Sequence, residues 1–296
     1  MQNMLLGKAG MPKITRDDLE KYLEQNRRSA ASLLVAFNAS QDAAYLKEAA
    51  ASFPNDPRVQ LTVLLNNAFP EERRQWLDRL KQSAADNSLA SYLSAHEYFQ
   101  RAQFEAGIND LLDAARRPAF EPYTFEGMLD TQELFLAAGK SPAEAKVSAM
   151  LGATFSHLAQ MKRLSSEMTE MQSQYRAAGD GESFDAMTAI GLTLAHRLDG
   201  PQGGKFIIDQ LVGMAMENQF LKPFDPASTP EFLGKPVQDR LDELEQQKAE
   251  IKKLAPLTSK YLPGASEAEL ITFFDRVKLQ GELEALRWLN ARRGGQ

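Results

Sequence analysis

Residues 88–118 read SLASYLSAHEYFQRAQFEAGINDLLDAARRP, and this stretch decides the fold that we expect for the chain. It predicts two short helices that meet at a tight turn. The small residues Ala95 and Gly107 stand where the two helices must touch, and Tyr98, Leu111 and Ala114 recur around them at helical spacing. The rest of the N-terminal half contains degenerate versions of this helical hairpin, and the C-terminal half reads as longer helices.

Helix start and stop signals predict further helices on both sides of the hairpin. Before it, helices are expected over residues 16–26, 28–38, 43–53, 59–68 and 71–85. After it, they are expected over residues 124–138, 143–178, 183–198, 204–221, 237–254, 267–279 and 282–291. Runs that alternate strictly between apolar and polar residues are absent, so we expect an all-α chain with essentially no sheet.

Local signals place several boundaries. Ser141 precedes a first-turn proline and Glu144, which together form a capping-box pattern, and Ser266 with Glu269 repeats it. No proline or glycine pair interrupts residues 143–178 after their start, so a single long helix is predicted there. Residues 222–235 hold three prolines and a glycine, which is typical of a linker or hinge.

Helix pairs recur along the N-terminal half. They begin near residues 23, 57 and 88, with a period of about 31–34 residues, which is typical of helical repeat arrays. A single hairpin cannot bury its apolar face alone, so neighbouring hairpins must stack. We therefore predict a repeat array over residues 14–140 and a helical bundle over residues 141–296, with a hinge near 222–235.

The 88–118 hairpin resembles a tetratricopeptide repeat. The family's small residue and aromatic of the first helix correspond to Ala95 and Tyr98. The conserved positions of the family's second helix correspond to Gly107, Leu111 and Ala114. The family's closing proline corresponds to Pro118, which stands at the neighbouring position. Ser91 and Ser94 stand where the family has an aromatic residue and a leucine. Earlier hairpins match in part, with Leu46, Ala49 and Pro54 in one and Leu80 and Ser83 in the next.

The resemblance implies a concave surface that binds a partner. In this family, set positions of the first helix line the groove. Carried over, these positions are Leu89, Tyr92, His96 and Phe99, with Arg58 and Leu61 at matching places one repeat earlier. Aromatic residues and arginine are frequent hot spots of protein interfaces. The alternative is that a third layer of helices folds over this face and buries it.

Composition excludes several classes of function. The 296-residue chain has a net charge of −6, which argues against a general nucleic-acid binder, and it has no cysteine for disulfides or thiolate chemistry. No apolar run approaches the roughly 18 residues of a membrane span, so we expect no integral membrane segment. The localisation stays open: cytoplasmic for the chain as it stands, or periplasmic if an export signal or anchor was removed. The oligomeric state also stays open.

Catalytic chemistry has little support in the sequence. The three histidines, His96, His157 and His196, lie in no tight metal-binding spacing, so neither a metal nor another cofactor is expected; a metal site assembled from distant helices is the alternative. We therefore predict a non-catalytic scaffold that binds a protein or peptide partner. A second hypothesis is a small-molecule or lipid carrier with a cavity rich in methionine and phenylalanine in the C-terminal bundle. An enzyme with a site built across helices is a third.

Overall fold

The computed structural model describes residue 5 and residues 12–200 and 204–293. Its N-terminal half contains the elements α2 (Arg16–Gln25), α3 (Ala30–Ser40), α4 (Ala43–Ser52), α5 (Pro57–Leu65), η1 (Pro70–Glu72), α6 (Arg73–Ser83), α7 (Ser88–Gln100), α8 (Phe104–Arg116) and α9 (Thr124–Ala137). Its C-terminal half contains α10 (Pro142–Leu151), α11 (Ser156–Ala178), α12 (Gly181–Asp199), α13 (Ile207–Leu221), α14 (Val237–Leu254), α15 (Pro256–Tyr261), η2 (Leu262–Gly264), α16 (Glu267–Gln280) and α17 (Glu282–Arg293).

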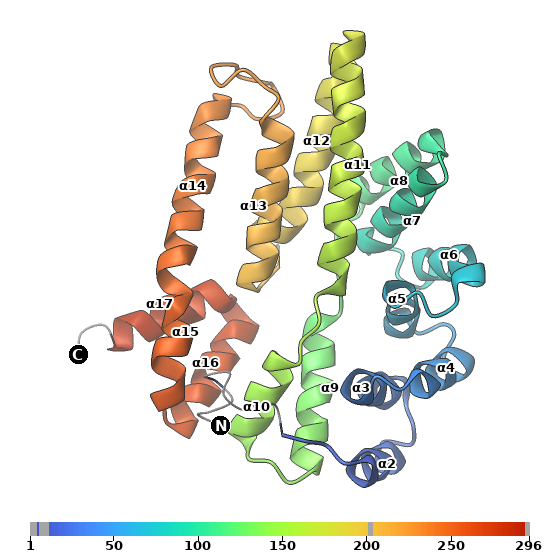
Figure 1. The fold of residues 1–296 in the computed structure, drawn as a ribbon, viewed down its shortest axis with the longest axis vertical. Coiled ribbons are helices and arrows are strands. Elements are labelled where there is room, and N and C mark those ends of the chain that lie inside the picture. Colours follow the sequence, from blue (N-terminus) through green and yellow to red (C-terminus); the bar gives the residue numbers. More distant parts are fainter. Residues whose placement is uncertain (1–4, 6–11, 201–203, 294–296) are drawn as a thin grey trace. The chain divides into compact units, whose positions relative to one another are not determined.

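The all-α prediction is confirmed for the described residues, which contain no strand (Figure 1). The β-type pairing found among them is a single bridge between Asn87 and Ala119. In the described ranges, no helix combines the length and the apolarity that crossing a bilayer requires. Both predicted capping boxes are present: Ser141 accepts from the backbone N–H of Glu144, and Ser266 accepts from that of Glu269.

The single helix predicted over residues 143–178 is wrong. The segment forms α10 and α11, separated by a short stretch at 152–155. Gly152 ends α10, and its N–H bonds to the carbonyl oxygen of Ser148 at 2.9 Å. Glycine inside a helix costs about 1 kcal/mol relative to alanine, so one glycine is enough to favour a break where packing also requires it. The helix α15 had no counterpart in the prediction.

The chain divides into two compact units that are discontinuous in sequence. Unit 1 comprises Met1–Ala90, Arg117–His157 and Ser259–Asp275, and unit 2 comprises Ser91–Arg116, Leu158–Thr258 and Arg276–Gln296. The predicted boundary between residues 140 and 141 falls inside unit 1, because α9 and α10 pack against each other as a hairpin. That residues 14–140 and 141–296 fold as two independent domains stays a prediction.

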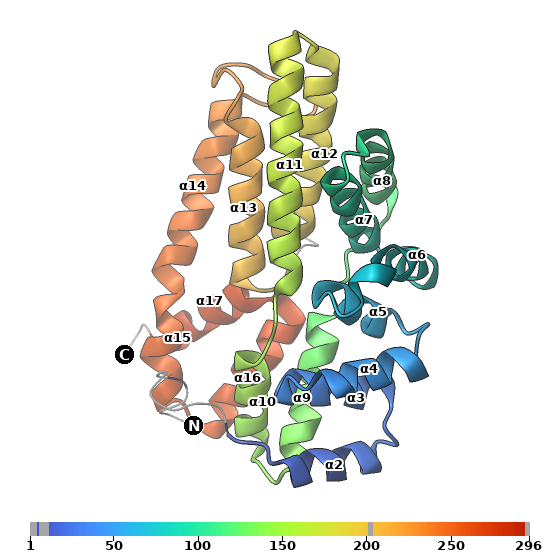
Figure 2. The same cartoon turned by 45° about the vertical axis from the view of Figure 1, so that its right-hand side comes forward.

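In unit 1, the helices α3 and α4 form one hairpin and α5 and α6 form the next, and α4 packs on α5 (Figure 1). The helix α9 lies against α2 and α3, on the side away from the outer helix α4 (Figure 2). Leucines from successive helices are buried in the core, including Leu33, Leu46, Leu77 and Leu134. The inner side of these hairpins is therefore covered in part by a helix of the same chain.

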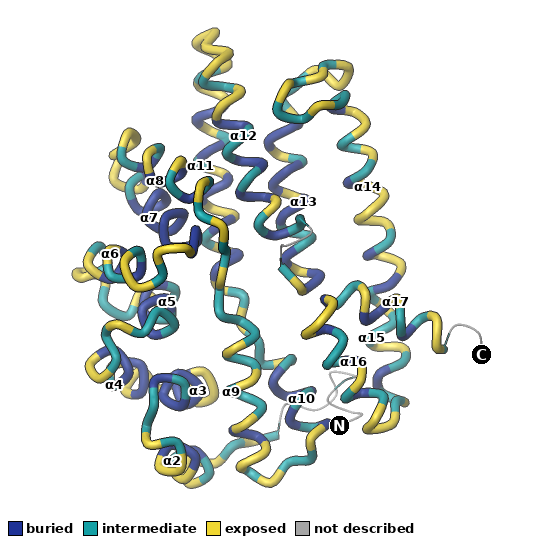
Figure 3. The backbone as a smooth tube through the Cα atoms, turned by 180° about the vertical axis from the view of Figure 1, so that it is seen from behind, coloured by how far each residue is buried: buried dark blue, intermediate teal, exposed yellow. Residues whose placement is uncertain are grey.

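In unit 2, α12 and α13 form an extensive antiparallel pair, which packs on α14 through α13 and on α8 through α12. Glycines allow this close approach: Phe220 of α13 lies over Gly191 of α12, and Gly213 of α13 lies against the last turn of α12. In the hairpin of α7 and α8, Gly107 similarly lies against the ring of Phe99. Buried and exposed positions alternate along α14 (Figure 3). Its buried residues include Leu244.

The predicted linker at residues 222–235 forms a loop with turns between α13 and α14. Its Phe224 packs on Phe184 of α12, with ring centroids 4.8 Å apart, and on Phe232 within the loop, at 5.6 Å. These contacts attach the loop to the end of the helical bundle in unit 2. That it acts as a hinge stays a prediction.

Candidate functional site

The residues predicted to line a groove lie in both units. Arg58 and Leu61 on α5 and Leu89 at the start of α7 belong to unit 1, and Tyr92, His96 and Phe99 on α7 belong to unit 2. All except Arg58 are buried, with Leu89 and Tyr92 wholly inaccessible to solvent. A partner could reach Leu89, Tyr92, His96 and Phe99 only after the helices that cover them had moved.

Other helices of unit 2 cover this part of α7. The imidazole Nδ1 of His96 lies 2.7 Å from Oε2 of Glu167 on α11. Arg197 on α12 interacts with the hydroxyl of Tyr92, although burial dominates and raises the pKa of Tyr92 to about 12. Here the structure matches the alternative in which further helices bury the face. That these residues bind a partner stays a prediction.

Arg58 and Leu61 lie together at a pocket in unit 1. The pocket, about 90 Å³ in volume, is formed by α3, α5, α9 and the loop that follows α10. Its walls combine apolar and ionisable side chains, among them Leu34, Arg58, Leu61, Met128, Asp130 and His157. This volume suits a few water molecules or the end of one side chain.

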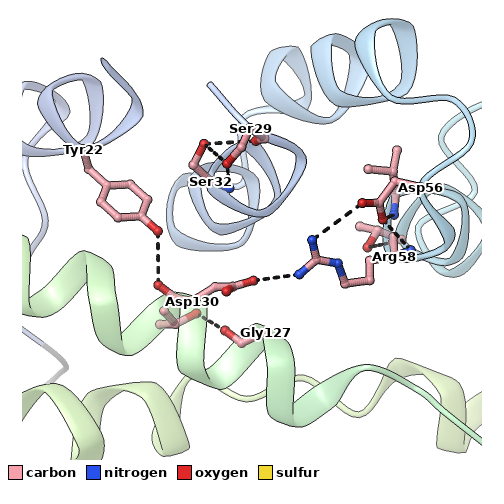
Figure 4. Close-up of polar contacts among 10 residues, drawn as sticks. Tyr22, Ser29, Ser32, Asp56, Arg58, Gly127 and Asp130 are labelled. Atoms are coloured by element: carbon pink, nitrogen blue, oxygen red, sulfur yellow. Dashed lines mark hydrogen bonds and ion pairs between the residues drawn. The ribbon is translucent and has the colours of Figure 1, made fainter. Parts of the chain in front are cut away.

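Polar side chains from α2 and α5 contact Asp130 at this pocket, as Figure 4 shows. The guanidinium Nη1 of Arg58 lies 3.2 Å from Oδ2 of Asp130, and Tyr22 on α2 donates its hydroxyl hydrogen to the backbone oxygen of Asp130 at 3.4 Å. Asp56 caps the start of α5 by accepting from the N–H of Arg58 at 2.8 Å, and its carboxylate also lies 3.6 Å from the guanidinium. Helix capping by Asp56 thereby places Arg58 at the pocket.

Negative charge exceeds positive charge around Asp130. Burial raises the pKa of the Asp130 carboxyl above its ordinary value, and the carboxylates of Glu133, Glu126 and Asp56 add to the rise, while Arg58 opposes it. One guanidinium therefore does not fully compensate a half-buried carboxylate with three acidic neighbours. A further cation at this pocket would be stabilised electrostatically.

His157 forms another part of the pocket wall and is 3% exposed. Its ring lies among aromatic residues, with centroids 6.1 Å from Phe120 and 6.5 Å from Phe155. Burial lowers the pKa of His157 to about 4. The imidazole is therefore neutral near pH 7 and contributes no positive charge to the pocket.

A second group of ionisable residues lies in unit 2, where α12 and α13 cross. His196 and Asp199 are three residues apart on the last turn of α12 and so share one face, and Glu217 projects from α13. One ligand atom from each side chain can be chosen so that all three atoms lie within 4.8 Å of one another. The Nε2 atom of His196 is 3.5 Å from Oε1 of Glu217.

The two carboxylates of this group differ in their partners. Glu217 is wholly inaccessible to solvent and accepts two hydrogen bonds from Arg240 of α14, from Nε and Nη2, each at 2.6 Å. Both carboxylate oxygens of Asp199 are also buried, but neither accepts a hydrogen bond from another described residue.

The pKa values follow this difference. Burial, together with the charge of Glu217, raises the pKa of Asp199 to about 7. Burial opposes ionisation of Glu217 as well, yet its hydrogen bonds with His196 and Arg240 hold its pKa below the ordinary value. The hydrogen bond with Glu217 also raises the pKa of His196.

The sequence places His196 in no tight metal-binding spacing, and it did not identify Asp199 and Glu217 as its neighbours. The spacing of His196 and Asp199 near a helix end was a usable signal, but their proximity to Glu217 depends on Gly213. A Cβ atom at Gly213 would lie 2.7 Å from Cβ of Asp199 and 2.8 Å from the backbone oxygen of Ala195. The absence of that atom permits the close crossing of the two helices.

Comparison of the chain with protein-family models, curated proteins and solved structures finds no match.

Proposed function

We propose that this chain is a non-catalytic interaction scaffold built from helical hairpins like those of tetratricopeptide repeats. In this proposal, the pocket beside Arg58 and Leu61 receives a side chain of a protein or peptide partner. The single observation that supports it is Asp130, a half-buried carboxylate at a small pocket, whose surroundings hold more negative than positive charge.

The charge of the pocket favours a basic anchor. A lysine or arginine side chain of the partner would place its charge beside Asp130, and its methylene groups would contact the apolar wall near Leu61 and Met128. The guanidinium of Arg58 would then pair mainly with the carboxylate of Asp56, which already lies 3.6 Å away. An acidic anchor would instead meet the carboxylates around Asp130 and be repelled.

Selection from a random peptide library on the full chain tests this proposal. We expect enriched peptides to share a basic residue beside an apolar one. Fluorescence anisotropy should then show affinity falling at least tenfold in Asp130→Asn. In Asp78→Asn, which removes an exposed carboxylate of α6 outside the pocket, the affinity should be unchanged.

Two results would overturn the proposal. One is a set of enriched peptides without a shared basic residue. The other is equal affinity for the wild type and Asp130→Asn, provided that circular dichroism shows both chains to be folded.

The carrier hypothesis finds no support in the described pockets of unit 2. Several methionines of the middle region lie in the core instead, among them Met161, Met168, Met187 and Met216. The pocket of about 1020 Å³ near the end of α12 is lined largely by charged and polar side chains, including Arg197, Asp199, Arg240 and Arg287. An apolar ligand would leave many of these groups without water or another partner.

A further inference from the structure

We propose that His196, Asp199 and Glu217 form a binding site for a divalent transition-metal ion such as Zn²⁺. The proposal concerns unit 2 and is independent of the pocket at Asp130. Its support is the geometry of the three ligand atoms, the helix crossing that holds them, and the carboxylate of Asp199, which has no hydrogen-bond partner among the described residues.

The geometry of the group lies close to that of a coordination sphere. Bonds of Zn²⁺ to nitrogen and oxygen are about 2.0–2.2 Å long, so two ligand atoms of one ion are at most about 4.4 Å apart. The three atoms of this group lie within 4.8 Å of one another. For coordination, the ligand atoms of His196 and Asp199 would have to move closer to Glu217 by rotation of their side chains.

The two helices hold the ligands in place. His196 and Asp199 occupy one turn of α12, and Gly213 brings α13 close enough for Glu217, four residues later, to reach the same point. Arg240 holds the Glu217 carboxylate through two hydrogen bonds and so fixes its orientation. Each carboxylate oxygen has two lone pairs, so Oε1 of Glu217 can accept from Arg240 and still face an ion beside His196.

Asp199 provides the independent indication of a ligand. Its two oxygens are buried and accept no hydrogen bond from the other described residues, whereas buried polar atoms in proteins nearly always have a partner. A cation at this point would supply one. When ionised, Asp199 and Glu217 would each place a negative charge beside the ion, and Arg240 offsets one of these charges.

The ligand types indicate the class of ion. Imidazole binds zinc, copper, iron and nickel well, whereas magnesium and calcium prefer ligand sets of oxygen atoms only. His196 is half exposed, and together with Asp199 it lines the pocket of about 1020 Å³, so an ion could enter from solvent. We therefore expect Zn²⁺ to bind more tightly than Mn²⁺, and Mg²⁺ to bind least.

Isothermal titration of the untagged, chelator-treated chain with ZnCl₂, MnCl₂ and MgCl₂ tests the site. We expect one Zn²⁺ per chain and a higher midpoint of thermal unfolding when Zn²⁺ is present. Asp199→Asn and His196→Gln should each weaken Zn²⁺ binding at least tenfold. Glu250→Gln is the matched control, because Glu250 lines the same pocket but is not among the three ligands, and its affinity should equal that of the wild type.

Three outcomes would overturn the proposal: no saturable binding of Zn²⁺, binding that both variants retain, or an equal loss in Glu250→Gln. Asparagine has the shape of aspartate, so Asp199→Asn should fold. If circular dichroism shows that it does not, His196→Gln decides the question, because His196 is half exposed and its replacement leaves the core intact.

Discussion

Replacing Gly213 by alanine should have two opposing effects on stability, a gain in helix propensity and a steric clash of the new Cβ atom. Inside a helix, alanine is more favourable than glycine by about 0.8–1.0 kcal/mol. At Gly213, however, the new Cβ would lie 2.7 Å from Cβ of Asp199 and 2.8 Å from two backbone atoms, the oxygen of Ala195 and the nitrogen of Asp199. Backbone atoms cannot rotate away, so the pair of helices α12 and α13 must separate.

Overpacking of a core typically costs about 1–3 kcal/mol, and the backbone contacts place Gly213 in the upper part of that range. Gly213→Ala should therefore lower the free energy of unfolding of unit 2 by up to about 2 kcal/mol after the helix gain is counted. The matched control is Gly127→Ala on α9, where a Cβ would meet nothing within 4 Å. There we expect only the gain of about 1 kcal/mol, in unit 1.

Each unit contains one tryptophan, whose fluorescence reports on its surroundings during urea unfolding. Trp76 belongs to unit 1 and Trp288 to unit 2, and the chain has no others. Gly213→Ala is measured in a Trp76→Phe background and Gly127→Ala in a Trp288→Phe background, each against its own parent. If Gly213→Ala stabilises its unit as much as Gly127→Ala does, the close crossing of α12 and α13 described above is refuted.

Three further predictions concern unit 1. The pKa of His157 is about 4 in the folded chain and about 6.5 in the unfolded chain, so the unfolded state binds more protons between these pH values. The free energy of unfolding should therefore fall by about 3 kcal/mol as the pH drops from 6.5 to 4. In urea titrations, His157→Phe should lack this loss. Arg58→Ala should lower stability by about 1–2 kcal/mol and raise the pKa of Asp130 further, which carbon NMR of the carboxyl group would detect; an unchanged pKa would contradict the ion pair. Ser141→Ala should cost about 1 kcal/mol by removing the cap of α10, and Ser141→Asp should recover most of it; equal stability of all three chains in thermal unfolding would argue against the cap.

Local sequence signals are sufficient to predict the all-α class and most helix positions. These depend on local physics: capping side chains such as Ser141 and Ser266, first-turn prolines, and apolar residues that recur with the period of a helix. The local signals failed at residues 152–155, where a single Gly152 ends a helix that the apolar pattern alone would continue. A lone glycine changes helix stability by only about 1 kcal/mol, so tertiary packing decides whether the chain breaks there.

Which side chains face solvent and which ionisable groups lie together depends on how the helices pack in three dimensions. The spacing of Tyr92 and His96 on one face of α7 suits a groove and a buried contact equally well, and the packing of other helices in unit 2 buries both residues. Asp199 and Glu217 are eighteen residues apart, and their proximity depends on a crossing that Gly213 permits. Burial and pKa depend on contacts distant in sequence, and single-sequence periodicity contains no information about which faces those contacts will cover.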